Sequence, residues 1–378
     1  MNKILSIFCG AHDGLFFKDV FQFPIKIMEE ENATLTYLCT NPIDEALVAT
    51  VPNLTIHNVG DRELLKSNLS SVKYLVNNAR EFDLLIQFHV RDYSLLNALL
   101  FTRLNPKGKA IIKADRGNLS LDSQGVLRKG YLRRIYEKLL LSLFKPNQLT
   151  ISYETDKAQK IAKELLPKTI NVIKTYNGHN VSPEQSITPF SEKNNTFLIV
   201  GAIGDKRKNH RIIIEAIDKI LDENENLLNG WDFKFVGGLA NPTFVKDIEQ
   251  RAKKYKYFNN SVKLLGSKNK AELYEFYDNS KYMILSSLHE GSPLIIPESL
   301  RFGNIILSTP VSSVPELIHQ CGYISDSFLT NDMKLMIESA IINAPKNAYK
   351  STKAYEWGLH LHWNELDYKP QLKKNMSL

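Results

Sequence analysis

Two glutamates stand on either side of a Gly-Ser-Pro segment in the last third of the chain. Glu290 and Glu298 are separated by seven residues. The apolar run 281–286 predicts a buried strand, and 293–301 predicts a helix with Ser292 as its N-cap and a proline at its first position. A helix that begins after a buried strand presents free N–H groups and the positive end of its dipole. The segment therefore predicts a site for a phosphate-bearing ligand.

The spacing of the two carboxylates suits a ligand with two polar ends. The helical residues between Ser292 and Glu298 span roughly 9 Å. Glu298 could accept hydrogen bonds from a ribose, and Glu290 could contact a sugar at the other end. The alternative to a ligand site is that Glu298 is simply an exposed helix glutamate and Glu290 a charge near the N-terminus of that helix. The neighbouring residues are apolar and favour a buried helix, in which an unpaired carboxylate is costly. They are Leu294, Ile295, Ile296 and Leu300.

A second loop combines glycines with three consecutive cations. Residues 200–205 include two glycines and precede Lys206, Arg207 and Lys208, directly after the predicted strand 196–200. Cations placed here could neutralise the charge that develops on a diphosphate leaving group, which would act mainly on the transition state. The alternative is a basic surface turn without a ligand.

These motifs resemble the signature of glycosyltransferase family 4. The signature has two glutamates separated by seven residues, then a glycine and a loop that leads to a Pro-Glu-Leu-Ile-like turn. The matching segments are 289–303, 305–311, 314–318, 265–266 and 272–277. The resemblance covers most of residues 195–330 and extends only loosely into the N-terminal half.

The resemblance implies a retaining transferase that uses a nucleoside-diphosphate sugar. It implies a GT-B fold, in which two Rossmann-like α/β domains face each other across a cleft. The first domain would bind the acceptor and the second the nucleotide sugar. The expected acceptor is a glycan, lipid-linked and part of surface polysaccharide synthesis. Retention by front-face attack and a hexosyltransferase type of reaction also follow from the resemblance.

Site residues carry over by motif position. The resemblance implies that Glu290 contacts the donor sugar, Glu298 the ribose, and Lys208 the donor phosphates. The family arginine of the cationic loop falls at Ala202 and is missing, so that Lys206 or Arg207 would have to replace it. Catalytic roles are expected for Glu290 and Lys208. The other expected donor-binding residues are Glu298, Gly291, Ser292, Leu294, Gly201, Arg207 and Gly10.

Polar residues after three N-terminal strands are candidates for acceptor or sugar contacts. His12 and Asp13 follow the first predicted strand, and His89 follows another. Asp115 ends the next strand, near the place where many family members have a histidine. The alternatives are a helix cap for His89 and a salt bridge with Arg116 or Lys113 for Asp115.

The pattern of the whole chain predicts two α/β domains. Short apolar runs alternate with longer amphipathic stretches, which is typical of parallel sheets covered by helices. The polar segment 177–195 predicts a linker. The expected domains are 1–185, which binds the acceptor, and 195–350, which binds the nucleotide sugar. A helical tail, 351–378, is expected to cross back to the first domain.

Composition limits the partners and the surroundings. The net charge of +7 favours phosphate-bearing partners, but no nucleic-acid module is recognisable, so nucleic acid is not expected as a partner. The three cysteines are far apart and form no Cys-x-x-Cys pair, which suits the cytoplasm. No Asp-x-Asp motif follows a strand, so we expect no metal and no cofactor beyond the donor substrate.

Residues 128–145 mix cations with leucines and tyrosines and could lie on the anionic inner face of a membrane. The alternative is an ordinary domain helix with a basic outer face.

Two other functions remain open at this point. A nucleotide-sugar epimerase also uses paired Rossmann domains, but it would convert the donor without an acceptor. A non-enzymatic nucleotide- or polyanion-binding protein would bind polyanions in a salt-dependent way and would lack nucleotide-sugar affinity.

Overall fold

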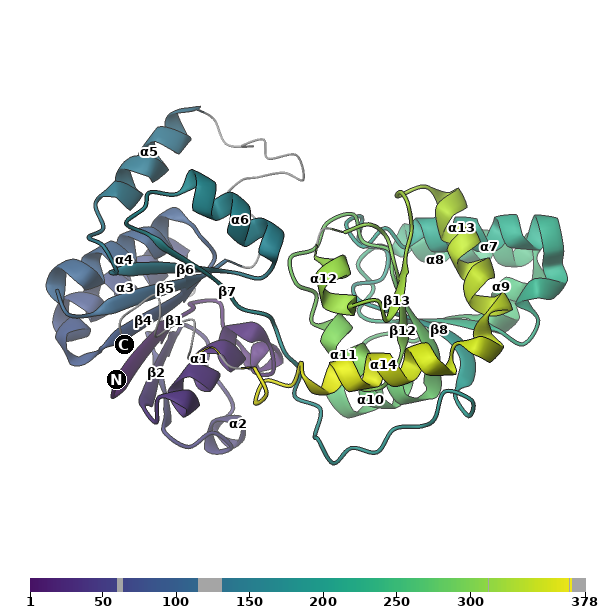
Figure 1. Ribbon diagram of the computed structural model, residues 1–378, viewed down its shortest axis with the longest axis horizontal. Helices are drawn as coiled ribbons and strands as arrows, with labels where there is room; N and C mark the ends of the chain where they lie inside the picture. Colours follow the sequence, from purple (N-terminus) through teal and green to yellow (C-terminus); the bar gives the residue numbers. More distant parts are fainter. Residues whose placement is uncertain (60–63, 115–130, 312, 367, 369–378) are drawn as a thin grey trace. The chain divides into compact units, whose positions relative to one another are not determined.

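The computed structural model describes residues 1–59, 64–114, 131–311, 313–366 and 368. The chain divides into two compact units (Figure 1). The first unit comprises Met1–Asn177 and Leu366–Leu378, and the second comprises Gly178–Glu365. Most of the segment expected to be a linker, 178–195, therefore groups with the second unit.

The first unit is built on a seven-stranded parallel sheet. Its strand order is β3-β2-β1-β4-β5-β6-β7. The strands are β1 Lys3–Ile7, β2 Thr34–Cys39, β3 Leu54–Asn58, β4 Leu84–Phe88, β5 Lys109–Lys113, β6 Leu149–Tyr153 and β7 Asn171–Lys174. The helices are α1 Asp19–Glu30, α2 Glu45–Ala49, α3 Leu64–Asn78, α4 Asp92–Leu104, α5 Tyr131–Ser142 and α6 Asp156–Leu165.

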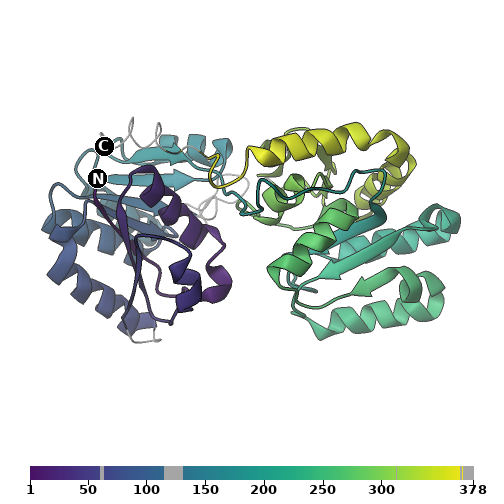
Figure 2. The same cartoon turned by 90° about the horizontal axis from the view of Figure 1, so that it is seen from below.

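The second unit is built on a six-stranded parallel sheet. In this unit, on the right of Figure 2, the strand order is β10-β9-β8-β11-β12-β13. The strands are β8 Asn194–Val200, β9 Asp232–Val236, β10 Val262–Leu264, β11 Ser280–Leu285, β12 Ile305–Ser308 and β13 Gly322–Ile324. The helices are α7 Arg211–Asn224, α8 Pro242–Lys254, α9 Lys256–Ser261, α10 Lys270–Asn279, α11 Ile295–Arg301, α12 Val314–Ile318, α13 Thr330–Ile342 and α14 Ala348–Leu359.

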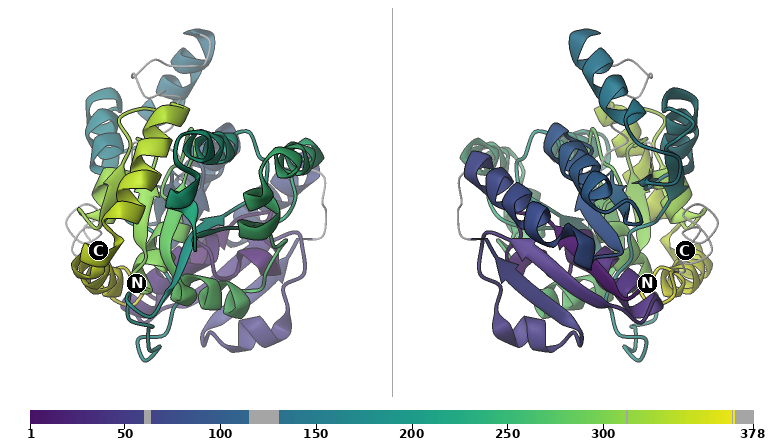
Figure 3. Two further views of the ribbon diagram at one scale, coloured as in Figure 1. Left: turned by 90° about the vertical axis from the view of Figure 1, so that its right-hand side faces the viewer. Right: turned by 90° about the vertical axis from the view of Figure 1, so that its left-hand side faces the viewer.

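Helices cover these sheets because the strands are apolar on both faces. Every residue of β4, β6 and β12 is buried, as expected for parallel strands with helices on both sides. In the first unit, apolar residues of α3 to α6 share one core with the sheet, and α3 lies beside α4 (Figure 3). In the second unit, α7, α8 and α13 share another. The predicted two-domain α/β architecture is confirmed.

The predicted start of the helix that carries Glu298 is wrong in detail. Helix α11 begins at Ile295 with Leu294 as its N-cap, so Ser292 is not the cap and Pro293 is not the first helical residue. The carbonyl of Pro293 instead accepts the N–H of Ile296 at 3.0 Å in a turn before the helix. Helix α11 is consequently seven residues long, and its first turn starts further from Glu290 than the sequence suggested.

The helix of the tail does not cross back to the first unit. Helix α14 packs along α11, where a Cβ on Gly358 would lie 2.5 Å from the backbone nitrogen of Arg301. Such a close approach requires glycine. The chain rejoins the first unit after the helix, from Leu366 onward. There the hydroxyl of Tyr368 donates to the carbonyl of Tyr176 at 2.7 Å.

Each sheet has one point at which the strand order reverses direction. In the first unit this point lies between β1 and β4, and in the second it lies between β8 and β11. Loops that leave such neighbouring strands diverge toward opposite faces of the sheet and leave a crevice at the carboxyl edge, where open α/β sheets bind ligands. The loops after β8 and β11 carry the cationic residues and the first glutamate singled out from the sequence.

Candidate active site

Lys208 and Glu290 meet at the strand reversal of the second unit. The Nζ atom of Lys208 lies 2.7 Å from Oε1 of Glu290. Lys208 follows β8 and Glu290 follows β11, so the pair joins the two diverging loops. The side chains are 23% and 16% exposed, which leaves the pair partly accessible to a ligand. The structure thus brings together the two residues predicted to be catalytic.

Hydrogen bonds fix the two loops to each other and to the sheet. The hydroxyl of Ser287 donates to Oε1 of Glu290 at 2.6 Å, and that of Ser286 donates to the carbonyl of Lys208 at 2.6 Å. The backbone N–H of Leu288 donates to the carbonyl of Arg207 at 2.8 Å. The carboxylate of Glu290 is therefore oriented by a lysine and a serine before any ligand arrives.

Two glycines allow the cationic loop to run close to its neighbours. Gly201 has a φ of +145°, and a Cβ there would lie 3.3 Å from the Cε atom of Lys208. Gly237, at the end of β9, has a φ of +150°, and a Cβ there would lie 1.9 Å from the carbonyl oxygen of Gly201. A side chain at Gly237 would force the two loops apart. The position of Lys208 depends on this close backbone approach.

Glu298 lies in a different environment from Glu290. Its side chain is almost fully buried and forms an ion pair with Lys270, the first residue of α10. The hydroxyl of Tyr277 donates to Oε2 of Glu298 at 3.4 Å. Burial and the Glu298 carboxylate raise the pKa of Tyr277, so that its hydroxyl keeps its proton and remains a donor.

Three partners of the two glutamates were not predicted from the sequence: Lys270, Tyr277 and Ser287. Only one of them carried a usable signal: Ser287 lies within the loop that holds Glu290. The capping box that starts α10, formed by Asn269 and Glu272, predicts a helix start at Lys270 but not the direction of its side chain.

The rest of the cationic loop differs from the expected phosphate clamp. Arg207 pairs with Asp205, and the distance from its Nη2 to Oδ2 is 2.9 Å. Hydrogen bonds from Arg207 lower the pKa of Asp205, which keeps this carboxylate charged. Ala202, where the family arginine would stand, offers no cation. Lys206 is exposed and forms no ion pair with any residue that the structure describes.

The residues between the two glutamates form a loop and the helix start. Gly291 is half-buried and Ser292 is buried. Leu294 is the N-cap of α11, and its carbonyl accepts the N–H of Glu298 at 3.3 Å. The expected contacts of the amides of Gly291, Ser292 and Leu294 with a diphosphate stay predictions.

The N-terminal candidates lie at the carboxyl edge of the first sheet. Gly10, His12 and Asp13 are exposed in the loop after β1, and Oδ1 of Asp13 accepts the N–H of Asp44 at 2.9 Å. His89 follows β4 with a φ of +62°, a conformation that is uncommon for a residue other than glycine. Its carbonyl accepts the hydroxyl of Ser94 at 2.6 Å. The remaining candidate, Asp115, lies outside the described residues.

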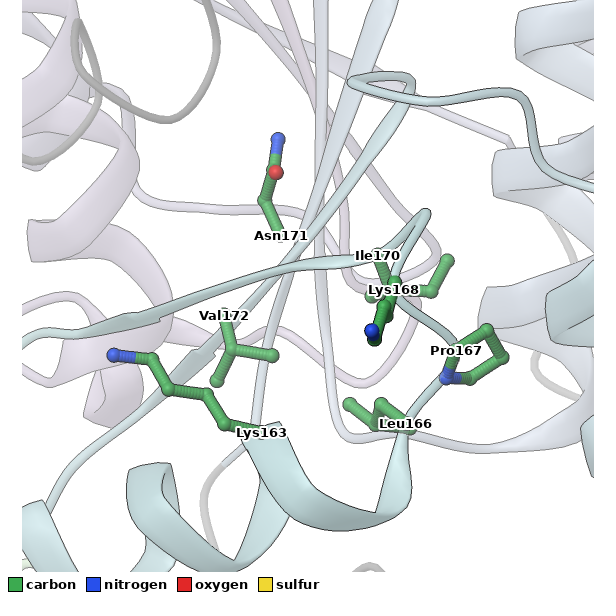
Figure 4. Close-up of a pocket in the computed structure, with 7 residues that line it drawn as sticks. All are labelled: Lys163, Leu166, Pro167, Lys168, Ile170, Asn171 and Val172. Atoms are coloured by element: carbon green, nitrogen blue, oxygen red, sulfur yellow. The ribbon is translucent and has the colours of Figure 1, made fainter.

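A pocket of about 180 Å³ in the first unit contains none of the predicted site residues (Figure 4). It lies where α6 joins β7, and its lining includes Lys163, Pro167 and Val172. This is the amino end of β7, whereas ligands of open parallel sheets bind at the carboxyl ends of the strands. We therefore assign it no role in catalysis.

The described residues contain neither a metal-binding cluster nor a membrane-spanning helix. No cluster of three or more His, Cys, Asp or Glu side chains among them is arranged to hold a metal ion. Within the same residues, no helix has the length and apolarity that crossing a bilayer requires.

Comparison with known families identifies the second half of the chain. Residues 182–357 match the family model described as glycosyl transferases group 1. This range includes Lys208, Glu290 and Glu298. A comparison with curated proteins gives no match.

Solved glycosyltransferase structures share the fold over the full length of the chain. HepE of Anabaena, solved in complex with UDP-glucose, has a TM-score of 0.68 and 14% identity, with 100% of both chains covered. Sucrose-phosphate synthase of Thermosynechococcus elongatus has a TM-score of 0.67 and 14% identity over 99% of this chain and 98% of its own. WaaG, a glycosyltransferase involved in lipopolysaccharide biosynthesis, has a TM-score of 0.65 and 14% identity over 99% of this chain and 100% of its own.

The two comparisons support different statements. The likeness to solved structures establishes the GT-B fold, and the match over 182–357 establishes a glycosyltransferase domain. The chain is therefore a glycosyltransferase with a GT-B fold, and the sequence-based prediction of this enzyme class is confirmed.

Proposed function

We propose that the enzyme is a retaining glycosyltransferase of family 4 that transfers a hexose from a nucleoside-diphosphate sugar to a glycan. The observation that carries this proposal is the Lys208–Glu290 pair at the strand reversal of the second sheet. A cation and a carboxylate held at 2.7 Å can separate when a donor enters, with the cation moving to the diphosphate and the carboxylate to the sugar.

The proposed roles follow from charge and position. Lys208 neutralises the diphosphate as the glycosidic bond breaks, and Glu290 orients the donor sugar. Glu298 accepts hydrogen bonds from the ribose while Lys270 and Tyr277 hold its other lone pairs. In the front-face reaction, the acceptor hydroxyl attacks the anomeric carbon on the side from which the diphosphate departs, and the departing phosphate oxygen takes the proton of that hydroxyl.

The proposed donor is a nucleoside-diphosphate sugar, and UDP-glucose is the first compound to test. HepE, which has the same fold, was solved with UDP-glucose and with UDP. The reaction as proposed uses no metal and no cofactor other than the donor, because Lys208 supplies a cation at the phosphate position. The proposed place of the reaction is the cytoplasm.

The proposed acceptor is a lipid-linked glycan reached at the inner face of a membrane. WaaG, one of the similar structures, takes part in lipopolysaccharide biosynthesis. In this chain, Tyr136, Leu139 and Leu143 are exposed at helical spacing along α5 and just beyond it, while Lys138 and Lys145 beside them are also exposed. Apolar side chains flanked by cations suit the interface of an anionic bilayer.

Membrane contact through α5 is tested with Leu139→Asp. Leu139 is 61% exposed, so the fold should tolerate the change. We expect co-sedimentation with phosphatidylglycerol-containing vesicles to weaken by about tenfold, because a buried leucine contributes about 1.5–3 kcal/mol. The matched control is Leu335→Asp, at an exposed leucine on α13. Equal vesicle binding by both variants and the wild type would remove this part of the proposal.

The donor assignment is tested by thermal stabilisation with UDP-, GDP- and ADP-sugars. A donor at about 100 times its Kd stabilises the folded state by about 2.7 kcal/mol. We expect one nucleotide class to raise the Tm of the wild type and of the control Lys253→Ala, at an exposed lysine on α8. The rise should be largely lost in Lys208→Ala. A rise of the same size in Lys208→Ala would show that the nucleotide binds elsewhere. Conversion of the donor sugar without an acceptor and without nucleotide release would indicate an epimerase.

A further inference from the structure

The second unit contains a larger pocket beside the cationic loop. Its volume is about 490 Å³, and it is lined by parts of segments 204–211 and 241–247. Neither Lys208 nor Glu290 lines it. The pocket lies where the loop after β8 meets the start of α8, at the carboxyl edge of the sheet.

The walls of this pocket are fixed by close packing between the two segments. Gly204 has a φ of +79°, and a Cβ there would lie 2.9 Å from the Cβ of Phe244. The N–H of Ile203 donates to the carbonyl of Gly238 at 2.8 Å, and the N–H of Ala240 donates to the carbonyl of Ile203 at 2.8 Å. The pocket is therefore formed before a ligand binds.

Two side chains leave hydrogen-bond donors available in the pocket. Oδ1 of Asn241 accepts from the N–H and from the hydroxyl of Thr243, so the Nδ2 amino group remains for a ligand. The Nδ1 atom of His210 accepts the N–H of Gly204 at 3.2 Å, which places the ring proton on Nε2. The His210 side chain is 3% exposed and lines the pocket. Its Nε2 bonds to no described residue and is not among the enclosed atoms.

Among the described charged residues that line the pocket, every one except Lys206 has an ion-pair partner, and that of Arg211 is Glu215. Asp205 is paired with Arg207, and Asp247 is paired with Arg251. Lys206 lines the pocket and has no ion-pair partner within the described part of the chain. Burial lowers the pKa of His210 to about 4, so the ring is neutral at pH 7 and acts as a donor through Nε2 alone.

We propose that this pocket is a second binding site, for a phosphate-bearing small molecule, distinct from the donor site at Lys208 and Glu290. Lys206 supplies the charge, and the Asn241 amino group and His210 Nε2–H supply directed donors to the phosphate oxygens. The ring of Phe244 lies in the pocket lining and offers an apolar surface to the rest of the ligand. The ligand is either free phosphate or a phosphorylated sugar. Because this site shares no side chain with the Lys208–Glu290 pair, it does not depend on the proposed transfer reaction.

Asn241→Asp is the variant that tests this proposal most directly. Aspartate is as good an N-cap as asparagine, so the start of α8 and the fold are retained. The change replaces the amino donor by a charged oxygen that repels phosphate. Lys206→Ala removes the free cation, and Lys253→Ala, at an exposed lysine in the last turn of α8, is the matched control.

The measurement is a calorimetric or NMR titration of the full chain with inorganic phosphate and with glucose 6-phosphate. We expect the affinity to fall at least about fivefold in Lys206→Ala and at least about tenfold in Asn241→Asp, and to be unchanged in Lys253→Ala. Equal affinity for the two probes identifies free phosphate as the ligand, and tighter binding of glucose 6-phosphate identifies a phosphorylated sugar. No binding of either probe, or binding that is lost in Lys208→Ala but kept in Asn241→Asp, overturns the proposal.

Discussion

The two glutamates of the motif have seven residues between them and are held by unlike partners. Glu290 is partly accessible and is bonded to Lys208 and Ser287. Glu298 is buried against Lys270 and Tyr277. The first arrangement leaves a carboxylate that can exchange partners with a ligand, and the second fixes a carboxylate in one orientation. These environments suit the proposed roles, a sugar contact at Glu290 and a ribose contact at Glu298.

Lys270 is predicted to act on donor binding through Glu298. Lys270→Met keeps the side-chain length but removes the charge, which leaves a buried carboxylate without its cation. We expect the KM for the donor to rise about fivefold and kcat to stay within about twofold, because only uniform binding is lost. The preference for UDP over 2′-deoxy-UDP should shrink as well. The control is Lys268→Met, whose ion pair with Glu272 lies at the surface. An unchanged KM would mean that Glu298 does not hold the ribose.

Contacts between residues could be predicted from the sequence where the order of the strands in the sheet determines them. Lys208 and Glu290 follow neighbouring parallel strands, so their meeting follows from the order of elements once the sheet is known. The partners of Glu298 depend on how α10 packs against α11, which the periodicity of neither helix specifies. The ion pair of Arg207 with Asp205, two residues away, was also not predictable. The sequence does not show whether the side chain of a cation points to a neighbouring residue or to a ligand.

At the scale of elements, a buried histidine helps to hold the short segment after the unit boundary. The ring nitrogens of His179 bond to the carbonyl of Gly358 at 2.8 Å and to the N–H of Val181 at 3.1 Å. His179 and the end of α14 therefore lie side by side, although they are far apart in the sequence. The polar composition of 177–195 predicted a linker, but burial of residues such as Phe190 and Lys193 depends on packing that composition does not report.

His179 makes the stability of the second unit depend on pH. Burial lowers its pKa to about 3, whereas an unfolded histidine takes up a proton below about pH 6.5. The unfolded state thus binds more protons between these values, and stability falls as the pH falls through this window. We expect a loss of about 2 kcal/mol from His179 between pH 7 and pH 5.

Urea unfolding at several pH values measures this loss. His179→Gln should be less stable than the wild type at pH 7 but should show a smaller loss between pH 7 and pH 5. His360→Gln, at an exposed histidine of the same unit, should keep the slope of the wild type. If His179→Gln also keeps the full slope, His179 is not the origin of the pH dependence.

At the scale of the whole molecule, the chain repeats one arrangement in two units. Both sheets are parallel, and each has a strand reversal beside its first strand, between β1 and β4 and between β8 and β11. Alternating apolar and amphipathic runs predicted this architecture because burial of both sheet faces imposes a strong pattern on the strands. The point at which the chain returns to the first unit was not predictable, because the close contact of α14 with α11 depends on Gly358, and the sequence does not show which backbone a glycine approaches.

The most direct test of the donor site is the rate at which Glu290→Gln releases nucleotide from the donor identified by thermal stabilisation. Glutamine keeps an oxygen for the bonds from Lys208 and Ser287, so the loop geometry is preserved. We predict that release falls at least about 100-fold while nucleotide affinity stays within about threefold. Glu275→Gln, at an exposed glutamate on α10, should behave as the wild type. Release by Glu290→Gln at the wild-type rate would contradict a catalytic site built on the Lys208–Glu290 pair.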